Sequence, residues 1–356
     1  MSTIKTPLSK LLNVNLPIIC APMAFAGTAD LASAVISSGA FAFIPAGFDT
    51  PAMIRQDLLS IGKRLGIAQG NPLPVGVGFI GWILDMVPDE PRLEEVLDEK
   101  PVAIWLAFGV DLGKYVARIR AHDSKRDHKT IVFVIVNSVE MALKAANEWK
   151  VDVIVAQGIE AGGHGGSESP PLLSLLPAIR DALPQGPLVV AAGGVTNGRQ
   201  IAALLTAGAD GVVLGTRFLF TNECKYNADQ KEAILKAGLN DTVRTLAYDD
   251  VGRTNYWPPK HNGRAICNKV MDDLNEGLDL ETRLKRFDGS AAAGDTSRLI
   301  VWAGVGVGLT DKITSATVSI VMIVCRKPLL KKASKDVVHD LQNETIAALS
   351  KLPKFL

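Results

Sequence analysis

Eight short apolar runs, each followed by a segment of helical character, constrain the fold of this chain more than any other feature. Runs rich in Val, Ile and Leu without alternating polar residues are typical of parallel strands that are buried on both faces. Eight strand–helix units in succession predict an α/β fold, namely a (β/α)8 TIM barrel. The runs are Pro17–Met23, Phe41–Ile44, Leu73–Phe79, Val102–Ala107, Ile131–Val136, Val151–Ala156, Leu188–Ala192 and Gly211–Gly215.

Residues suited to capping a helix stand between the apolar runs. Thr28, Ser138 and Asn197 each precede a segment with apolar residues at helical spacing, and their side chains can accept a hydrogen bond from the first helical turn. A doubly wound sheet is the weaker alternative, because no Gly-x-Gly-x-x-Gly motif opens the first unit. The barrel is therefore the expected fold.

The regular alternation stops after the eighth run. Residues 222–297 are more polar and hold several aromatic residues, so we expect a mainly helical insertion that forms a lid domain. The barrel itself is then expected over residues 1–221 and 298–325. The last segment, 326–356, is rich in Lys and Arg and is expected to form a helical tail.

Charge and cysteine content narrow the class of protein. The chain has 38 basic and 37 acidic residues, so electrostatics favour neither nucleic acid nor an anionic membrane as a partner. The four cysteines are too scattered for a metal site and suit reduced thiols. The N-terminus lacks a signal-peptide core, and the apolar run Ala316–Cys325 is too short to span a bilayer. These features predict a cytoplasmic enzyme without a metal.

Small residues follow the seventh and eighth runs, where TIM barrels often bind phosphate. Gly193 and Gly194 follow the seventh run, and Gly215 and Thr216 lie where the eighth run ends. Their backbone amides, together with the Thr216 hydroxyl, can hold a phosphate group. The alternative is that these glycines only permit tight turns between strand and helix.

One histidine follows a barrel strand at the end where active sites lie. His164 ends the sequence Gln157-Gly-Ile-Glu-Ala-Gly-Gly-His behind the sixth run, whereas His122 and His128 lie in a charged stretch before the fifth run. A neutral imidazole can take a proton from a carbon acid or donate a hydrogen bond to an oxyanion. Redox chemistry would need a cofactor, and the glycines of this segment allow close approach of a flat ligand.

Two further residues are candidates for contact with such a cofactor. Met23 is the last residue of the first run, where its thioether can line a flavin ring, although methionine is also a common core filler. Gln157 follows the sixth run, and its amide can hydrogen-bond a heteroaromatic edge. A solvated loop glutamine is the alternative for Gln157.

Four of these segments together resemble the nitronate monooxygenase family, formerly called 2-nitropropane dioxygenases. They are Ala21-Pro-Met23, Gln157–His164, Ala191-Ala-Gly-Gly-Val195 and Gly215-Thr-Arg-Phe218. The resemblance covers roughly residues 10–310, and Pro74-Val-Gly-Val-Gly-Phe-Ile-Gly-Trp82 is similar to the fungal branch. It implies a TIM barrel with FMN that oxidises alkyl nitronates, such as propionate 3-nitronate, with O2 to a carbonyl compound plus nitrite.

The resemblance also assigns expected roles to residues. His164 is expected to act as a base on neutral nitroalkanes or to stabilise the bound nitronate. The positions that match FMN contacts are Met23, Gly78, Gln157, Gly162, Gly193, Gly194, Leu214, Gly215 and Thr216.

Two departures from the family pattern affect the cofactor environment. Many members have Asn where this chain has Gly78, and some carry a Lys near the end of the fifth strand, where this chain reads Val134-Ile-Val-Asn137. Both changes remove polar contacts to the cofactor, which bears on flavin potential and substrate preference.

Other functions remain open on the sequence. The main alternative is an FMN-dependent enoyl-acyl carrier protein reductase that uses NAD(P)H. A flavin-binding protein without turnover is disfavoured, because FMN binding alone does not require an imidazole at His164. The expected partners are a small nitronate or nitroalkane and O2, and the oligomeric state is open, a homodimer included.

Overall fold

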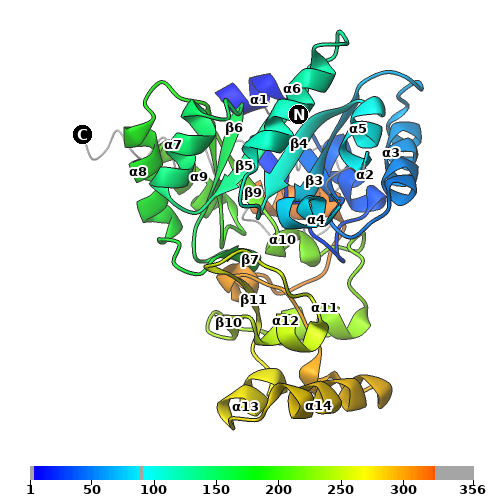
Figure 1. The fold of residues 1–356 in the computed structure, drawn as a ribbon, viewed down its shortest axis with the longest axis vertical. Helices are drawn as coiled ribbons and strands as arrows, with labels where there is room; N and C mark the ends of the chain where they lie inside the picture. The colour runs from blue at the N-terminus through cyan, green and yellow to red at the C-terminus, as the bar shows by residue number, and fades with distance from the viewer. Residues whose placement is uncertain (1–3, 88–90, 325–356) are drawn as a thin grey trace, which may run out of the picture.

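Eight parallel strands close into a barrel in the order β1-β2-β3-β4-β5-β6-β8-β9 (Figure 1). The computed structural model describes residues 4–87 and 91–324, so the tail expected over residues 326–356 lies outside the described residues. The predicted TIM barrel is confirmed. Its strands are β1 (Ile18–Cys20), β2 (Phe41–Pro45), β3 (Leu73–Ile80), β4 (Pro101–Ala107), β5 (Ile131–Val136), β6 (Val153–Gln157), β8 (Leu188–Ala192) and β9 (Gly211–Leu214).

Helices surround the barrel, and the three predicted caps begin three of them. Thr28 accepts from the amide of Leu31 at 3.0 Å, and Ser138 and Asn197 make the equivalent bonds at 3.1 Å. Such a cap contributes about 1 kcal/mol. The helices of the barrel part are α1 (Pro7–Leu11), α2 (Ala29–Ser37), α3 (Pro51–Leu65), α4 (Gly81–Met86), α5 (Arg92–Asp98), α6 (Gly113–Asp123), α7 (Val139–Asn147), α8 (Leu172–Ala182), α9 (Gly198–Thr206), α10 (Thr216–Leu219) and α15 (Ala316–Val324).

Large side chains fill the barrel interior. Phe43 packs edge-on against Trp105 and Phe133, with ring centroids 5.3 and 5.1 Å apart. Gly76 makes room for this cluster, because a Cβ there would lie 2.1 Å from the Phe43 ring. At the end of the barrel, Trp105 forms part of the wall of a cavity.

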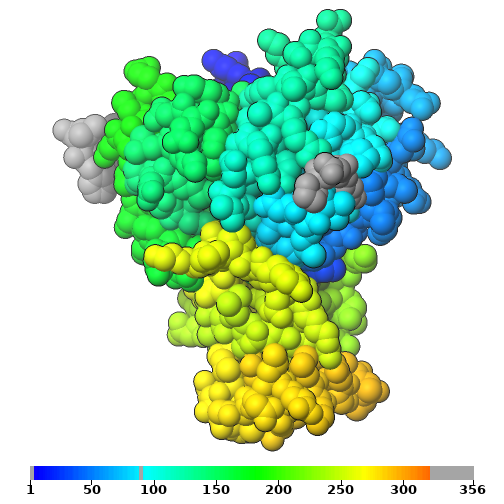
Figure 2. All heavy atoms as spheres, in the orientation of Figure 1, coloured from blue at the N-terminus to red at the C-terminus, as the bar shows by residue number. Residues whose placement is uncertain are grey.

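Residues 222–297 extend from one end of the barrel (Figures 1 and 2). Helices α13 and α14 lie farthest from the barrel, and α11, α12 and a small sheet lie between (Figure 1). Two 3₁₀ helices, η1 (Thr296–Arg298) and η2 (Val305–Leu309), follow. The elements of this segment are α11 (Ala228–Lys236), β10 (Thr242–Thr245), α12 (Ala247–Gly252), β11 (His261–Ile266), α13 (Lys269–Asn275) and α14 (Leu280–Ala292).

The glycine-rich segment after β6 ends in a short strand. Strand β7 (Gly163–Gly166) pairs antiparallel with β11, with Gly263 opposite His164, in a sheet of order β10-β11-β7. The partner strand lies about a hundred residues farther along the chain, so local sequence does not indicate the pairing. This sheet joins residues 222–297 to the barrel.

Among residues 4–87 and 91–324, no helix combines the length and apolar character needed to cross a bilayer. In the same residues, no group of three or more His, Cys, Asp or Glu side chains is arranged to hold a metal ion.

Candidate active site

A cavity of about 430 Å³ opens at the carboxyl ends of the barrel strands, where the insertion covers them. Thr254 and Trp257 of the insertion complete its wall. The sequence-predicted residues that line it are Met23, Gly78, Gln157, Gly162, His164, Gly193, Gly194, Gly215 and Thr216. Leu214 does not line it: its side chain is fully buried in the core, and its carbonyl accepts from the amide of Ala21 at 3.0 Å.

Backbone amides on one part of the wall lack protein partners. The amides of Gly193 and Gly194 have no acceptor among the described residues, and both glycines have positive φ, +121° and +68°. Thr216 begins helix α10, so its amide has no intrahelical acceptor. The Thr216 hydroxyl accepts from the amide of Gly304 at 2.9 Å, which leaves its hydrogen to donate. This group of donors suits an anion such as a phosphate.

The side chain of Gln157 holds strand β7 in place. Its amide nitrogen donates to the carbonyl of His164 at 3.1 Å, and its amide oxygen accepts from Asn137 at 3.0 Å. Asn137 also donates to the Gln157 carbonyl at 3.0 Å. Gln157 is buried, so it is not the solvated loop residue considered as an alternative. Asn137, which stands near the position of the lysine of some relatives, thus supports the cavity wall from behind.

Several glycines of this segment serve close packing within the protein. A Cβ on Gly162 would lie 2.2 Å from the amide nitrogen of Gly304, and one on Gly165 would lie 2.4 Å from the Gln157 side-chain oxygen. A Cβ on Gly166 would lie 2.8 Å from Asn137. The sequence analysis explained these glycines by the close approach of a flat ligand. The structure shows that they also let β7 approach its neighbours.

His164 lies between two tryptophans. Its ring stacks on Trp257 with centroids 3.5 Å apart and planes inclined by 7°, and Trp302 lies at 4.7 Å. The His164 side chain is 12% exposed. The two tryptophans therefore hold the imidazole in one orientation at the cavity wall.

A carboxylate that the sequence analysis missed contacts His164. Asp249, on helix α12, is fully buried, and its Oδ1 lies 2.8 Å from Nε2 of His164. The same oxygen accepts from Thr254 Oγ1 and from Trp257 Nε1, both at 2.9 Å. The sequence offers only an Asp-Asp pair in a polar insertion, which has no motif that signals this contact.

Burial determines the charge state of His164. It lowers the pKa of the imidazole below its ordinary value, and the hydrogen bond and charge of Asp249 offset only part of that effect. Nearby Arg244 and His261 lower the pKa further. The imidazole is therefore neutral near pH 7 and able to accept a proton.

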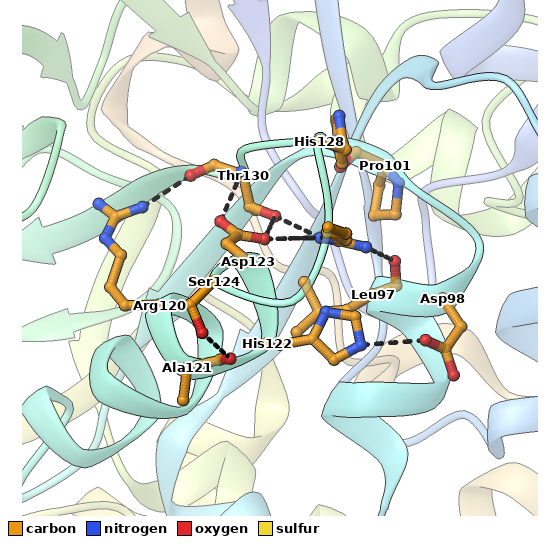
Figure 3. Close-up of polar contacts among 11 residues, drawn as sticks. Leu97, Asp98, Pro101, Arg120, Ala121, His122, Asp123, Ser124, His128 and Thr130 are labelled. Carbon is orange, nitrogen blue, oxygen red and sulfur yellow. Dashed lines mark hydrogen bonds and ion pairs between the residues drawn. The ribbon is translucent and has the colours of Figure 1, made fainter.

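The other described histidines do not line the cavity. His122 Nε2 lies 3.0 Å from Asp98 Oδ1, and His128 Nε2 lies 3.1 Å from the carbonyl of Pro101 (Figure 3). Both precede β5, at the amino ends of the strands, as the sequence predicted. His261, on β11, contacts Phe108 with ring centroids 5.8 Å apart and does not line the cavity.

The cavity wall is largely apolar and carries little charge. Among the described residues that line it there is no Lys, Arg, Asp or Glu. Two arginines of the insertion lie behind the wall and donate to carbonyls of the segment before His164: Arg244 to Ala161 at 2.8 Å and Arg264 to Ile159 at 3.2 Å. Burial lowers the pKa of Arg244 to about 10. The site thus offers a neutral base, a few amide donors and aromatic walls.

Comparisons with known proteins match this chain to one family model and to several proteins of similar sequence or fold. The model of the nitronate monooxygenase family matches residues 78–325. A nitronate monooxygenase of Neurospora crassa is 32% identical over 365 residues, covering 95% of this chain and 91% of that protein. The structure of FabK from Thermotoga maritima superposes with a TM-score of 0.75 at 25% identity, over 99% of this chain and 100% of that one. A nitroalkane oxidase from Streptomyces ansochromogenes gives a TM-score of 0.72 at 26% identity, over 97% and 99%.

Proposed function

Because the chain belongs to the nitronate monooxygenase family of flavin-dependent oxidoreductases, we propose that it binds FMN and oxidises alkyl nitronates with O2. The products are a carbonyl compound and nitrite. The observation that supports this most is the neutral imidazole of His164, held between two tryptophans in the same cavity as three amides that lack protein acceptors.

The residues of the cavity suit FMN. Gly193, Gly194 and Thr216 would hold the phosphate through their amides, and Met23 and Gln157 belong to the wall available to the ring system. When bound, FMN supplies the electron transfer to oxygen that no side chain of the cavity can perform. The aromatic wall excludes water from the substrate.

His164 acts on the substrate by proton transfer or by hydrogen bonding. Its Nε2 is occupied by Asp249, and Nδ1 has no partner among the described residues. A neutral nitroalkane would lose its α-proton to His164, since the lowered pKa keeps the imidazole unprotonated near pH 7. A preformed nitronate needs no such step, and the imidazole then orients its nitro oxygens.

Two measurements test this function. The purified protein should be yellow with one FMN per chain, and it should consume O2 with ethylnitronate or propionate 3-nitronate. A colourless preparation that FMN does not reconstitute, or no oxygen uptake with either nitronate, would refute the proposal. His164→Asn should reduce activity on nitroethane far more than on ethylnitronate, and equal losses would show that His164 is not the base.

The similarity to FabK supports one alternative, an FMN-dependent reductase of enoyl thioesters that uses NAD(P)H. The discriminating assay is anaerobic NADH consumption with an enoyl thioester, compared with oxygen uptake on a nitronate by the same preparation. Turnover in the first assay alone would establish the reductase.

Two further properties stay predictions. We propose that residues 222–297 act as a lid on the barrel and that the enzyme is cytoplasmic, and the oligomeric state, a homodimer included, is left to measurement. Light scattering of the holoenzyme measures the mass of the assembly, and a single-chain mass of 37.9 kDa would exclude the dimer.

A further inference from the structure

We propose that Asp249 is the positioning residue of the site: it fixes His164 in the tautomer that carries its proton on Nε2 and presents Nδ1 to the substrate. This inference rests on the proposed function, in which His164 is the base. It assigns a role in the reaction to the insertion, because Asp249 lies on α12 and His164 lies on β7.

The hydrogen bonds at Asp249 determine the tautomer. Its Oδ1 receives contacts from Thr254 Oγ1, Trp257 Nε1 and His164 Nε2, at 2.9, 2.9 and 2.8 Å. An ionised carboxylate accepts hydrogen bonds and donates none, so Nε2 must carry the hydrogen. Nδ1 then holds the lone pair.

Nδ1 is accessible from the cavity. No described residue forms a hydrogen bond with Nδ1, and Nδ1 does not belong to the fully buried side-chain atoms without a partner. Its residue, His164, lines the cavity. The stacking of Trp257 on the ring prevents a flip about the Cβ–Cγ bond, which would move Nε2 away from Asp249. Trp257 also bonds to Asp249, so one side chain holds both members of the pair.

Burying the carboxylate of Asp249 destabilises the folded state unless its negative charge is paired with a positive one. The side chain is fully buried, and its second oxygen, Oδ2, has no partner among the described residues. Burying a carboxylate with incomplete hydrogen bonding destabilises the folded state. When His164 takes a proton, the carboxylate charge is paired, because the imidazolium and the carboxylate then form a direct charge-assisted hydrogen bond.

Other groups near His164 lower the pKa of its imidazole and so oppose the effect of Asp249. Arg244, from β10, and His261, from β11, both lower the pKa of the imidazole, as does burial, which is the largest cause. Asp249 is the group that raises it. Removing the carboxylate therefore moves the pKa of His164 to lower pH and weakens the base.

The kinetic test uses two substitutions that separate charge from contact. Asp249→Asn keeps an acceptor oxygen for Nε2–H but removes the charge, and Asp249→Ala removes both. For nitroethane, kcat/KM should fall about 10- to 100-fold in Asp249→Ala and less in Asp249→Asn. For ethylnitronate it should change by less than about threefold, since no proton is abstracted.

The pH profile gives a readout that a purely structural role would not move. Activity on nitroethane rises with pH as His164 loses its proton, and the midpoint of that rise should shift to lower pH in both variants. Asp98→Asn is the matched control, because Asp98 pairs with His122 at 3.0 Å on the far end of the barrel (Figure 3). It should leave both activities and the midpoint unchanged. Equal losses on the two substrates, or an unmoved midpoint, would overturn the proposal.

Histidine ¹⁵N NMR of the holoenzyme tests the tautomer without turnover. The His164 signal is identified by its loss in His164→Gln, among the five histidines of the chain. We expect a proton on Nε2 in the parent protein and a mixture of tautomers in Asp249→Ala. A proton on Nδ1 in the parent would overturn the proposal. Failure of the parent enzyme to oxidise any nitronate would instead refute the proposed function, and the NMR result would stand apart from it.

Discussion

The packing of Gly162 against the returning segment of the barrel gives a sharp prediction. Replacing Gly162 with Ala would place a Cβ 2.2 Å from the amide nitrogen of Gly304 and 2.5 Å from the carbonyl carbon of Ala303. Both neighbours are backbone atoms, so no side chain can rotate away. The segment around residues 303–304 must move, and with it the hydrogen bond from Gly304 to Thr216.

The adjacent glycine provides the matched control. Gly163 has φ +63° and nothing within 4 Å of an added Cβ, so Gly163→Ala costs only left-handed backbone strain, roughly 1–2 kcal/mol. Gly162→Ala adds an overlap of more than 1 Å with a fixed neighbour. Overpacking of this kind typically costs about 1–3 kcal/mol, and unyielding backbone puts this case at or above the upper end.

Thermal unfolding of the apoprotein at a fixed scan rate measures the difference. At roughly 2.1 cal/mol/K of unfolding entropy per residue, 1 kcal/mol lowers Tm by about 1.3 °C in a chain of 356 residues. Gly162→Ala should therefore lower Tm by about 4 °C or more and Gly163→Ala by about 1–3 °C. Gly162→Ala should also weaken FMN binding, because the displaced segment carries the Thr216 contact. Equal Tm changes for the two variants, or none for Gly162→Ala, would refute the packing argument.

Three further predictions concern the site. The kcat/KM profile for a neutral nitroalkane should reach half its plateau below pH 6.5, the ordinary His value, because burial lowers the pKa of His164; a midpoint above 6.5 would contradict this. Arg244→Met removes the donor to the carbonyls of Ala161 and Asn262 and should destabilise by about 1–3 kcal/mol in urea unfolding. Arg253→Met removes an exposed ion pair with Asp288 and a hydrogen bond to the carbonyl of Val251, and should cost less than about 1 kcal/mol. Propionate 3-nitronate should be used about tenfold less efficiently than 3-methylbutyl-1-nitronate, which has a similar shape but no carboxylate, since no described lining residue is a Lys or Arg that would pair with that carboxylate. Equal kcat/KM values would show that the carboxylate stays in water.

Local signals in the sequence were enough to predict the barrel. The signals are apolar runs without alternation and the residues between them that cap helices, such as Thr28 and Ser138. Each signal depends only on residues within one helical turn or one strand. Eight repeats leave few ways of burying every strand, and closure of the sheet is the simplest. The same regularity showed where 222–297 departs from it.

The order of the strands also placed several residues of the candidate site. Gly193, Gly194 and Thr216 follow the strands whose carboxyl ends commonly bind phosphate, and His164 follows the strand that precedes them in space. All four line one cavity in the structure. Leu214 stands in the same sequence motif but points into the core, because alternate residues of a strand face opposite sides.

The sequence by itself determined a barrel with one imidazole and two glycine-rich turns at the same end. Only the tertiary structure decided what surrounds that imidazole. Asp249 is 85 residues from His164 along the chain, and Trp257 and Trp302 are farther still. Contacts of this kind come from the docking of one segment on another, and they leave no periodicity in the sequence. Strand β7 forms for the same reason: its glycines have weak strand preference of their own, and β11 supplies the partner.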